Sequence, residues 1–230
     1  MPIFELPEDE IVFPKPELAE ADGLLAVGGD LSPLRLLTAY SLGIFPWFNE
    51  DNPILWWSLD PRLLCFPREI TFSKSLMQRI KRREFEVKID ANFRKVVELC
   101  ANVKRNNQKG TWISAEIIDS YMQLHQMGYA HSFETYKENR LVGGLYGVSL
   151  GAMFSGESMF HLETDASKVA FYYLIQFAIK HHFHFIDCQQ VTSHMLSMGG
   201  RAVARKEFLQ GLRESLNKNT LVGKWNDLNN

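Results

Sequence analysis

The sequence predicts an α+β protein in which a small N-terminal domain precedes a larger C-terminal domain. Two observations indicate this class. The first 67 residues are rich in proline, glycine and aromatic side chains and offer a single clear helix, whereas regular elements begin after about residue 62. From there the patterns predict helices, an antiparallel meander, a helix, a strand and a last helix, which is an α+β order. We therefore divide the 230 residues into 1–62 and 63–230.

The N-terminal helix is bracketed by start and stop residues. Ser32 can cap its first turn, and Pro33 suits the first helical position because the N–H that proline lacks would be unpaired there. Gly43 follows the last helical residue. The surrounding segments DGLLAVGGDLSP, GIFPWF and NPILWWSLDPR predict short irregular structure.

Three helices are expected before the meander, near residues 73–82, 91–101 and 115–127. The third has the clearest pattern, since its apolar residues recur at helical spacing and Gly128 ends it. Those apolar residues are Ile117, Ile118, Tyr121 and Leu124. They give this helix one apolar face.

Strand signals follow in AHSFETY, RLVGGLYGVSL and GAMFSGESMF, with a turn at residues 137–139 and glycines where bulges are expected. A long helix from Asp165, the strand FHFID (residues 183–187) and a helix near 205–216 complete the domain. A meander that leads through a helix to a further strand is similar to the acyltransferase fold of the N-acetyltransferase superfamily. We therefore expect a GNAT-like C-terminal domain.

Composition and charge exclude several classes of protein. With 46% hydrophobic and 12% aromatic residues, the chain should fold rather than stay disordered. No apolar run approaches the roughly 18 residues of a membrane span, and the first residues lack the pattern of a secretory signal, so we expect a cytoplasmic protein with no membrane partner. The net charge of −2 gives no global attraction to nucleic acid. No apolar heptad is visible, so a monomer is the default.

The cysteines and histidines do not predict a metal site. Cys65, Cys100 and Cys188 are far apart and odd in number, which argues against a disulfide framework and against a zinc ribbon. The histidines around the last strand are His181, His182, His184 and His194. Because they span a helix end and a strand, they have no consistent ligand spacing. From these residues we expect no metal site.

The stretch FHFIDCQQ, residues 183–190, places an acid, a thiol and two amides after a short apolar run. Residues two apart on a strand share a face, so Asp187 and Gln189 are predicted to point into one cleft. Cys188 lies between them and is predicted to face the opposite side as a packing residue. The pattern alone leaves two interpretations open, a functional pair and a network that ties the strand end to its neighbour.

Residues 68–83, REITFSKSLMQRIKRR, carry six basic residues against the single Glu69, a local charge of +5. If Ser73 caps a helix, the apolar residues share one face and the basic residues project mainly elsewhere. The five basic residues from this expected helix onward are Lys74, Arg79, Lys81, Arg82 and Arg83. Charge alone allows either a solvated face or a surface that binds phosphates.

Several motifs resemble those of one family. They are DGLLAVGGDLS, GIFPWF, PILWWSLDPR, GTWIS, AHSFETY, LVGGLYGVSLGAMFSGESMF, ASK and IDCQ. In this order and spacing, from about Phe13 to Phe208, they are similar to the leucyl/phenylalanyl-tRNA–protein transferases. Leu59, His161 and Gly200 stand where the family commonly has Pro, Ser and Ala. His161 follows GES closely enough to alter the charge of the site near neutral pH.

The resemblance implies a bacterial cytoplasmic enzyme that moves Leu, Phe or Met from aminoacyl-tRNA to the N-terminal Arg or Lys of a protein, which marks that protein for degradation. It implies no metal and no coenzyme A. In this interpretation Asp187 orients Gln189 and the incoming amine, and Gln189 contacts the reacting centre of the donor. Glu157 helps to hold the donor's amino group or the acceptor. The basic residues of 68–83 neutralise phosphates of the tRNA.

The resemblance also implies an apolar pocket for the donor. It places Trp47, Leu145 and Phe154 around the donor side chain, and Tyr40, Trp112 and Tyr121 near the donor. Trp47 follows Phe45 and Pro46 after a helix, where a loop side chain is easily presented to a cleft. Trp56 and Trp57 are instead expected in the core. The acid-rich residues 5–22 and Glu157 are candidates to hold the acceptor's cation.

Two other functions stay open. An acyl-coenzyme A N-acyltransferase would need a glycine-rich turn that cradles pyrophosphate at a helix N-terminus, but the strand-to-helix junction here has the sequence GESMFHLETDASK. The other alternative is a non-catalytic module that binds the end of tRNA. Within the leading interpretation, Asp187 could either remove a proton or only orient its partners.

Overall fold

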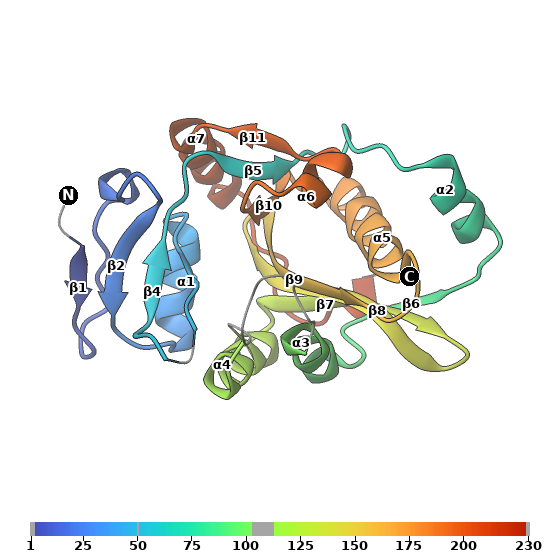
Figure 1. The fold of residues 1–230 in the computed structure, drawn as a ribbon, viewed down its shortest axis with the longest axis horizontal. Helices are drawn as coiled ribbons and strands as arrows, with labels where there is room; N and C mark the ends of the chain where they lie inside the picture. The colour runs from blue at the N-terminus through green and yellow to red at the C-terminus, as the bar shows by residue number, and fades with distance from the viewer. Residues whose placement is uncertain (1–2, 50, 103–112, 229–230) are drawn as a thin grey trace.

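The computed structural model describes residues 3–49, 51–102 and 113–228. Two sheets, one of four strands and one of seven, lie beside each other with helices packed against both (Figure 1). The predicted α+β class, with a small N-terminal part before a larger C-terminal part, is confirmed, and the meander, helix and further strand that led us to expect a GNAT-like domain are present. No helix within these residues is long and apolar enough to cross a membrane.

The N-terminal part contains a sheet where irregular structure was predicted. In spatial order its strands are β1 (Phe4–Leu6), β2 (Leu24–Gly28), β4 (Leu55–Trp57) and β3 (Phe45–Pro46), and a 3₁₀ turn, η1 (Pro16–Leu18), precedes β2. These strands are too short for their alternation to be recognised in the sequence. Trp56 is fully buried, as predicted, and donates from its indole nitrogen to the Gly28 carbonyl at 2.9 Å. Trp57 is only partly buried.

The predicted N-terminal helix is confirmed as α1 (Pro33–Ser41). The Ser32 hydroxyl accepts a hydrogen bond from the Arg35 backbone nitrogen at 3.4 Å, and Gly43 adopts a φ of +76° just beyond the helix. The buried face of α1 includes Tyr40, which is 2% exposed. Its hydroxyl reaches Tyr121 of the C-terminal part, so the two parts meet there.

The large sheet contains the predicted meander at its centre. Its spatial order is β11 (Arg201–Val203), β5 (Arg62–Cys65), β10 (Phe185–Gln189), β9 (Met153–His161), β8 (Arg140–Leu150), β7 (Ala130–Lys137) and β6 (Glu86–Ile89). Strands β7, β8 and β9 form the meander, and β9 pairs with β10 in parallel. The strands β5, β6 and β11, each of three or four residues, were not predicted.

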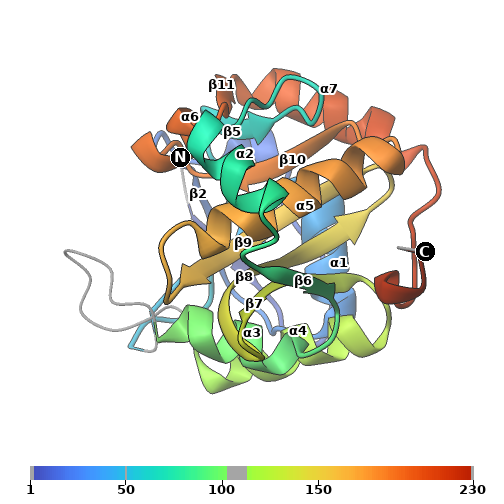
Figure 2. The ribbon, with the colours of Figure 1, turned by 90° about the vertical axis from the view of Figure 1, so that its right-hand side faces the viewer.

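Helices cover both faces of this sheet. The crossover helix α5 (Ala166–Lys180) lies on one face with α2 (Lys74–Lys81) beside it, and α3 (Phe93–Ala101) and α4 (Ala115–Gln126) lie on the other (Figures 1 and 2). The C-terminal region adds α6 (Ser193–Ser197), α7 (Arg205–Leu216) and the 3₁₀ turn η2 (Trp225–Leu228). All helices predicted in the C-terminal domain are therefore present.

The starts of β10 and β5 can be compared with the predicted strand and the predicted domain boundary. β10 begins at Phe185, two residues later than the predicted strand, because Phe183 still belongs to the helix exit and its backbone nitrogen donates to the Ala178 carbonyl at 2.8 Å. β5 begins at Arg62 and already belongs to the large sheet. The domain boundary at residue 62 stays a prediction.

Candidate active site

A cavity opens where the two parallel strands separate. The last paired residues of β9 and β10 are Ser155 and Asp187. Beyond them, residues 156–159 of β9 and residues 188–190, at and just past the end of β10, line a cavity of about 510 Å³. Residues 45–47 of the N-terminal part form a further wall. The site therefore depends on both parts of the chain.

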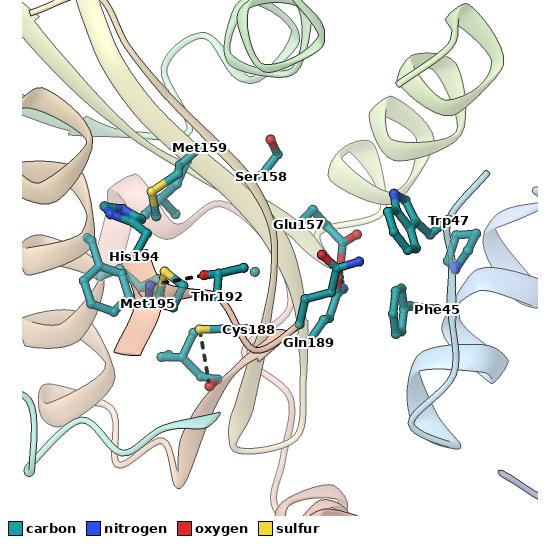
Figure 3. A pocket seen from close by; sticks show the side chains of 17 residues that line it. Phe45, Trp47, Glu157, Ser158, Met159, Cys188, Gln189, Thr192, His194 and Met195 are labelled. Carbon is teal, nitrogen blue, oxygen red and sulfur yellow. Dashed lines mark hydrogen bonds between the residues drawn. The ribbon is translucent and has the colours of Figure 1, made fainter. Parts of the chain in front are cut away.

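The cavity is lined mainly by apolar residues, with the carboxyl group of Glu157 and the amide of Gln189 at one end and Thr192 and His194 toward the other. Figure 3 shows Glu157 and Gln189 facing Phe45 and Trp47, while Met159 and Met195 lie at the opposite end. The other apolar residues of the lining are Leu145, Phe171, Leu174 and Ile186. A concave apolar surface with a few convergent polar groups is typical of a small-ligand site.

Glu157 is the centre of a hydrogen-bond network at the polar end. Gln189 donates from Nε2 to Glu157 Oε1 at 3.0 Å, and the Tyr121 hydroxyl donates to Oε2 at 3.0 Å. The Ser155 hydroxyl donates to Oε1 at 3.3 Å, and the hydroxyls of Tyr40 and Tyr121 share a hydrogen bond. Each carboxylate oxygen therefore has at least one donor.

Burial raises the pKa of Glu157 from 4.5 to about 7. Hydrogen bonds from the neighbouring hydroxyls oppose this rise, and the negative charge of Asp187 adds to it. Burial also raises the pKa of Tyr40 and of Tyr121 well above 10, so both phenols keep their protons at neutral pH. A carboxyl with a pKa near neutrality can exchange protons under physiological conditions.

The backbone at Gln189 breaks the predicted alternation. The register between β10 and β5 shifts between Asp187 and Gln189, and Gln189 has a φ of +60°. This left-handed conformation costs about 1–2 kcal/mol for a residue with a side chain. A hydrogen bond from the Gln189 backbone nitrogen to Asp187 Oδ1 at 2.9 Å offsets part of that cost.

As a result, the prediction for the faces of the three residues was wrong in two respects. Gln189 lines the cavity as expected, but Cys188 lines it too, and Asp187 does not. Asp187 is 2% exposed and lies behind Gln189, bound to Arg62. A single left-handed residue at a strand end changes which side chains reach the cavity.

Arg62 and Asp187 form a buried bidentate ion pair. Arg62 donates from Nε to Asp187 Oδ1 at 2.8 Å and from Nη2 to Oδ2 at 2.7 Å. Their side chains are 1% and 2% exposed. The network that ties the strand end to its neighbour, one of the two interpretations of this stretch, is thus present, and it lies directly beside the cavity.

Cys188 packs against another thiol. Its Sγ lies 3.6 Å from Sγ of Cys65 on the neighbouring strand β5. This contact, together with burial, raises the pKa of Cys188 well above its ordinary value. The thiol therefore stays neutral, and a neutral thiol is a poor nucleophile.

The residues predicted for the donor pocket divide into two groups. Trp47 and Leu145 line the cavity, whereas Phe154 is fully buried and does not line it. The ring of Phe154 packs under Gly147, where a Cβ atom would lie 2.6 Å from it, and its centroid is 6.0 Å from that of Trp225. The prediction of Phe154 as a wall residue was wrong, because it lies where β9 is still paired with β10 and its ring is buried in the core.

The other two described aromatic candidates lie behind the wall. Tyr40 and Tyr121 are buried and reach the site only through the hydrogen bonds to Glu157. Trp112 lies outside the described residues. Phe45, Met159 and Met195 line the cavity but were not predicted from the sequence, and His194 was considered only as a possible metal ligand.

The basic residues of α2 are not equivalent. Lys74, Lys81, Arg82 and Arg83 are exposed. Arg79 instead donates to Glu84 at 2.8 Å, to Asp165 at 3.1 Å and to the Thr164 carbonyl at 2.8 Å. Its charge is thus compensated within the protein. Four exposed basic residues remain on this surface, of which Arg82 lies 3.9 Å from Glu84 and is 72% exposed.

His161 lies at the end of β9 and is exposed. It acts electrostatically on His194, whose pKa is lowered by burial first and then by the charges of Lys168 and His161. Among the described residues, no group of three His, Cys, Asp or Glu side chains could hold a metal ion. Because His194 lines the cavity, the charge of His161 acts on the part of the cavity near Met159 and Met195.

Comparison with known proteins identifies the family. The family described as "Leucyl/phenylalanyl-tRNA protein transferase" matches residues 64–213, and its N-terminal domain matches residues 29–60. A leucyl/phenylalanyl-tRNA–protein transferase of Maridesulfovibrio salexigens is 52% identical over 98% of this chain and 94% of its own length. One from an Anaeromyxobacter species is 52% identical over 98% and 95%.

Among solved structures, L-PGS from Bacillus licheniformis is similar with a TM-score of 0.40 and 12% identity, over 70% of this chain and 50% of that one. An aminoglycoside acetyltransferase from an uncultured soil sample gives 0.37 and 14%, over 51% and 86%. The two sequence relatives match nearly the whole chain. On the strength of its sequence, this chain belongs to the leucyl/phenylalanyl-tRNA–protein transferase family.

Proposed function

We propose that this protein transfers Leu, Phe or Met from aminoacyl-tRNA to the N-terminal Arg or Lys of acceptor proteins, and so marks them for degradation. One observation carries the proposal: an apolar cavity of about 510 Å³ ends at the paired side chains of Glu157 and Gln189. The apolar part suits the donor side chain, and the polar end suits the ester. We assign the reaction to the cytoplasm, to a monomer and to a protein without a cofactor.

The chemistry needs alignment more than a strong base. The acceptor's α-amine has an ordinary pKa of roughly 7.7–8.0, so on the order of a tenth is already nucleophilic near pH 7. Its nitrogen attacks the ester carbonyl carbon, the new amide bond forms, and the bond to the ribose oxygen of the terminal adenosine breaks. The amine proton ends on that oxygen. Holding amine and carbonyl in line can contribute several kcal/mol.

The polar end supplies groups for each part of this step. Glu157, with a pKa of about 7, accepts the amine proton and passes it toward the leaving oxygen. Gln189, whose Nε2 lies 3.0 Å from Glu157, turns its amide toward the donor's reacting centre. Asp187 holds the Gln189 backbone rather than removing a proton, because it does not line the cavity and its carboxylate is paired with the Arg62 guanidinium.

The apolar lining accounts for a donor range that includes both aromatic and aliphatic side chains. A single methylene in an apolar pocket distinguishes ligands by only about 1–3 kcal/mol. Met159 and Met195 at the apolar end are unbranched and adapt to different shapes. Overlapping acceptance of Leu, Phe and Met follows from such a pocket.

Transfer of labelled Phe tests the proposal. Purified protein is mixed with charged Phe-tRNA and a peptide that begins with Arg, and the label on the peptide is measured. A matched peptide that begins with Ala controls for acceptor selectivity. Binding of the tRNA without transfer would support a non-catalytic module instead.

Replacing Trp47 should weaken donor binding. Trp47 lines the cavity opposite Glu157 and Gln189, and its ring centroid lies 5.6 Å from that of Trp57. Trp47→Ala should raise the KM for Phe-tRNA about tenfold, since loss of one aromatic contact is worth roughly 1 kcal/mol or more. Steady-state kinetics at several donor concentrations measure this. A large loss of thermal stability with unchanged KM would show that Trp47 contributes to core packing and not to donor binding.

Reversing exposed charges on α2 should weaken tRNA binding and flatten its salt dependence. The double variant Lys81→Glu/Arg82→Glu removes two exposed cations of the described surface. Neutralised phosphates release counterions, so losing two contacts should reduce the magnitude of the slope of log affinity against log salt by about 1.4 for single strands to 1.8 for duplex. Binding titrations at several salt concentrations measure the slope.

Arg79→Gln provides the matched comparison for that experiment. Arg79 is paired with Glu84 and Asp165. Its replacement should lower stability slightly and leave the salt slope unchanged. An unchanged salt slope in the double variant would instead mean that Lys81 and Arg82 contact solvent and not the phosphates of the tRNA.

A further inference from the structure

Arg62 occupies an unusual position beside the cavity. Its guanidinium carbon lies 4.7 Å from the ring centroid of Phe45 and 4.6 Å from that of Phe208. Phe45 belongs to the N-terminal sheet and lines the cavity, whereas Phe208 belongs to α7. The planar cation is therefore held between two aromatic rings from different parts of the chain, a geometry that suits arginine and not lysine.

The strand register explains how Arg62 reaches the site. Leu64 lies opposite Asp187 in the antiparallel pair of β5 and β10. Arg62 is two residues before Leu64, so its side chain lies on the same face as Asp187. Both side-chain hydrogen bonds of Arg62 within the described residues go to Asp187, and the buried Nη1 has no hydrogen-bond partner there.

A short chain of contacts links Arg62 to the polar end of the cavity. Asp187 Oδ1 accepts from Arg62 Nε at 2.8 Å and from the Gln189 backbone nitrogen at 2.9 Å. That second bond holds Gln189 at its φ of +60°. The Gln189 side chain then donates to Glu157 at 3.0 Å. Moving the guanidinium would move the carboxylate, then the strained backbone, and then the amide.

We propose that Arg62 is a positioning residue of the transfer reaction, which acts through Asp187 to fix the Gln189 amide and which couples that amide to the cavity wall at Phe45. This inference rests on the proposed transferase function. It differs from a purely structural role, because the aromatic rings and the bidentate bond fix the carboxylate's orientation as well as its charge.

Arg62→Lys tests the proposal, because lysine keeps the charge but loses both the planar stack and the bidentate bond. Donor contacts stay in place, so the KM for Phe-tRNA should stay within about threefold while kcat falls about 30-fold or more, as expected when reacting groups shift by a fraction of an ångström. Stability is measured in parallel by chemical denaturation.

Arg205→Lys is the matched control. Arg205 is another buried arginine, 9% exposed, whose guanidinium donates to the Pro16 carbonyl at 3.2 Å. The Arg205→Lys variant should be less stable than the native protein, while its kcat stays within about threefold of the native value, because the Arg205 guanidinium is not bonded to Asp187. Parallel losses of kcat in the two variants, or a near-native kcat for folded Arg62→Lys, would overturn the inference.

A second variant covers the case in which Arg62→Lys does not fold. Phe208→Leu removes one face of the sandwich and leaves the ion pair intact, so kcat should fall by about fivefold through looser orientation. An unchanged kcat in this variant overturns the inference. A native protein that transfers no Phe would overturn the proposed function, which separates that failure from a failure of the role of Arg62.

Discussion

Glu157→Gln should lower kcat at least about 10²-fold while leaving the KM for Phe-tRNA nearly unchanged. The substitution keeps the size of the side chain. Its amide oxygen can still accept from Gln189 and its amide nitrogen can donate to the Tyr121 hydroxyl, but the proposed proton acceptor is removed. Loss of a positioned general base or acid typically costs about 10²–10⁴-fold in rate. Single-turnover transfer at saturating donor measures the chemical step directly.

The pH dependence separates this role from simple hydrogen bonding. In the native enzyme both Glu157, with a pKa of about 7, and the peptide amine must lose a proton. Below these pKa values, log(kcat/KM) of the native enzyme should therefore rise with pH at a slope that approaches about 2. In the Glu157→Gln variant the slope should be about 1. A variant that keeps the native slope and most of the rate would show that Glu157 only organises the site.

The same substitution should not harm the fold. A carboxyl whose pKa rises from 4.5 to about 7 on folding stabilises the native state below pH 4.5, and this contribution is lost as pH rises through about 7. By pH 8 the free energy of unfolding has lost roughly 3 kcal/mol from this group as an upper bound. Water that enters the cavity makes the actual loss smaller. The free energy of unfolding of the Glu157→Gln variant should lack this decline between pH 5 and 8, which denaturation at both pH values measures.

Much of the fold follows from local patterns in the sequence. The helix α1 is bracketed by Ser32 and Gly43, and the meander of β7, β8 and β9 alternates over many residues. Such elements carry enough signal within their own length. The short strands β5 and β11 do not, because three or four residues give too few positions for a period, and their pairing partners are far along the chain.

The site shows the same limit at the level of single residues. Gln189 was placed in the cavity because alternation held for it, but the register shift before it exchanged the positions predicted for Asp187 and Cys188. Nothing in FHFIDCQQ marks a left-handed glutamine. That conformation depends on the Asp187 carboxylate, whose orientation depends on Arg62, 125 residues away. Tertiary contacts thus decided what local periodicity left open.

Asp187→Asn should destabilise the protein more than any other single substitution considered for the site. Asp187 and Arg62 are 2% and 1% exposed, and neutralising one of them leaves the other charge buried without a counterion. Breaking a buried pair in this way typically costs about 3–5 kcal/mol. Chemical denaturation measures the change. A loss below about 1 kcal/mol would mean that the pair contributes as little as an exposed one.

A matched carboxylate controls for the effect on activity. Asp90 is also 2% exposed, pairs with His131 at 2.8 Å and accepts from the backbone nitrogens of Ser132 and Trp225. Asp90→Asn should lower stability while kcat at a temperature where the variant is folded stays within about threefold of native, because Asp90 does not line the cavity or bond to a residue that does.

Removing both charges separates stability from catalysis. In the double variant Arg62→Met/Asp187→Asn no buried charge remains unpaired, and replacing a buried ion pair with neutral side chains is often neutral or stabilising. Most of the stability lost in Asp187→Asn should therefore return. The kcat should not, since the Gln189 backbone has lost its charged partner and the fixed orientation of that partner. Recovery of both quantities together would show that the pair serves only the fold, whereas a stable and inactive double variant would show that the cavity depends on the direction in which Asp187 holds the strand end.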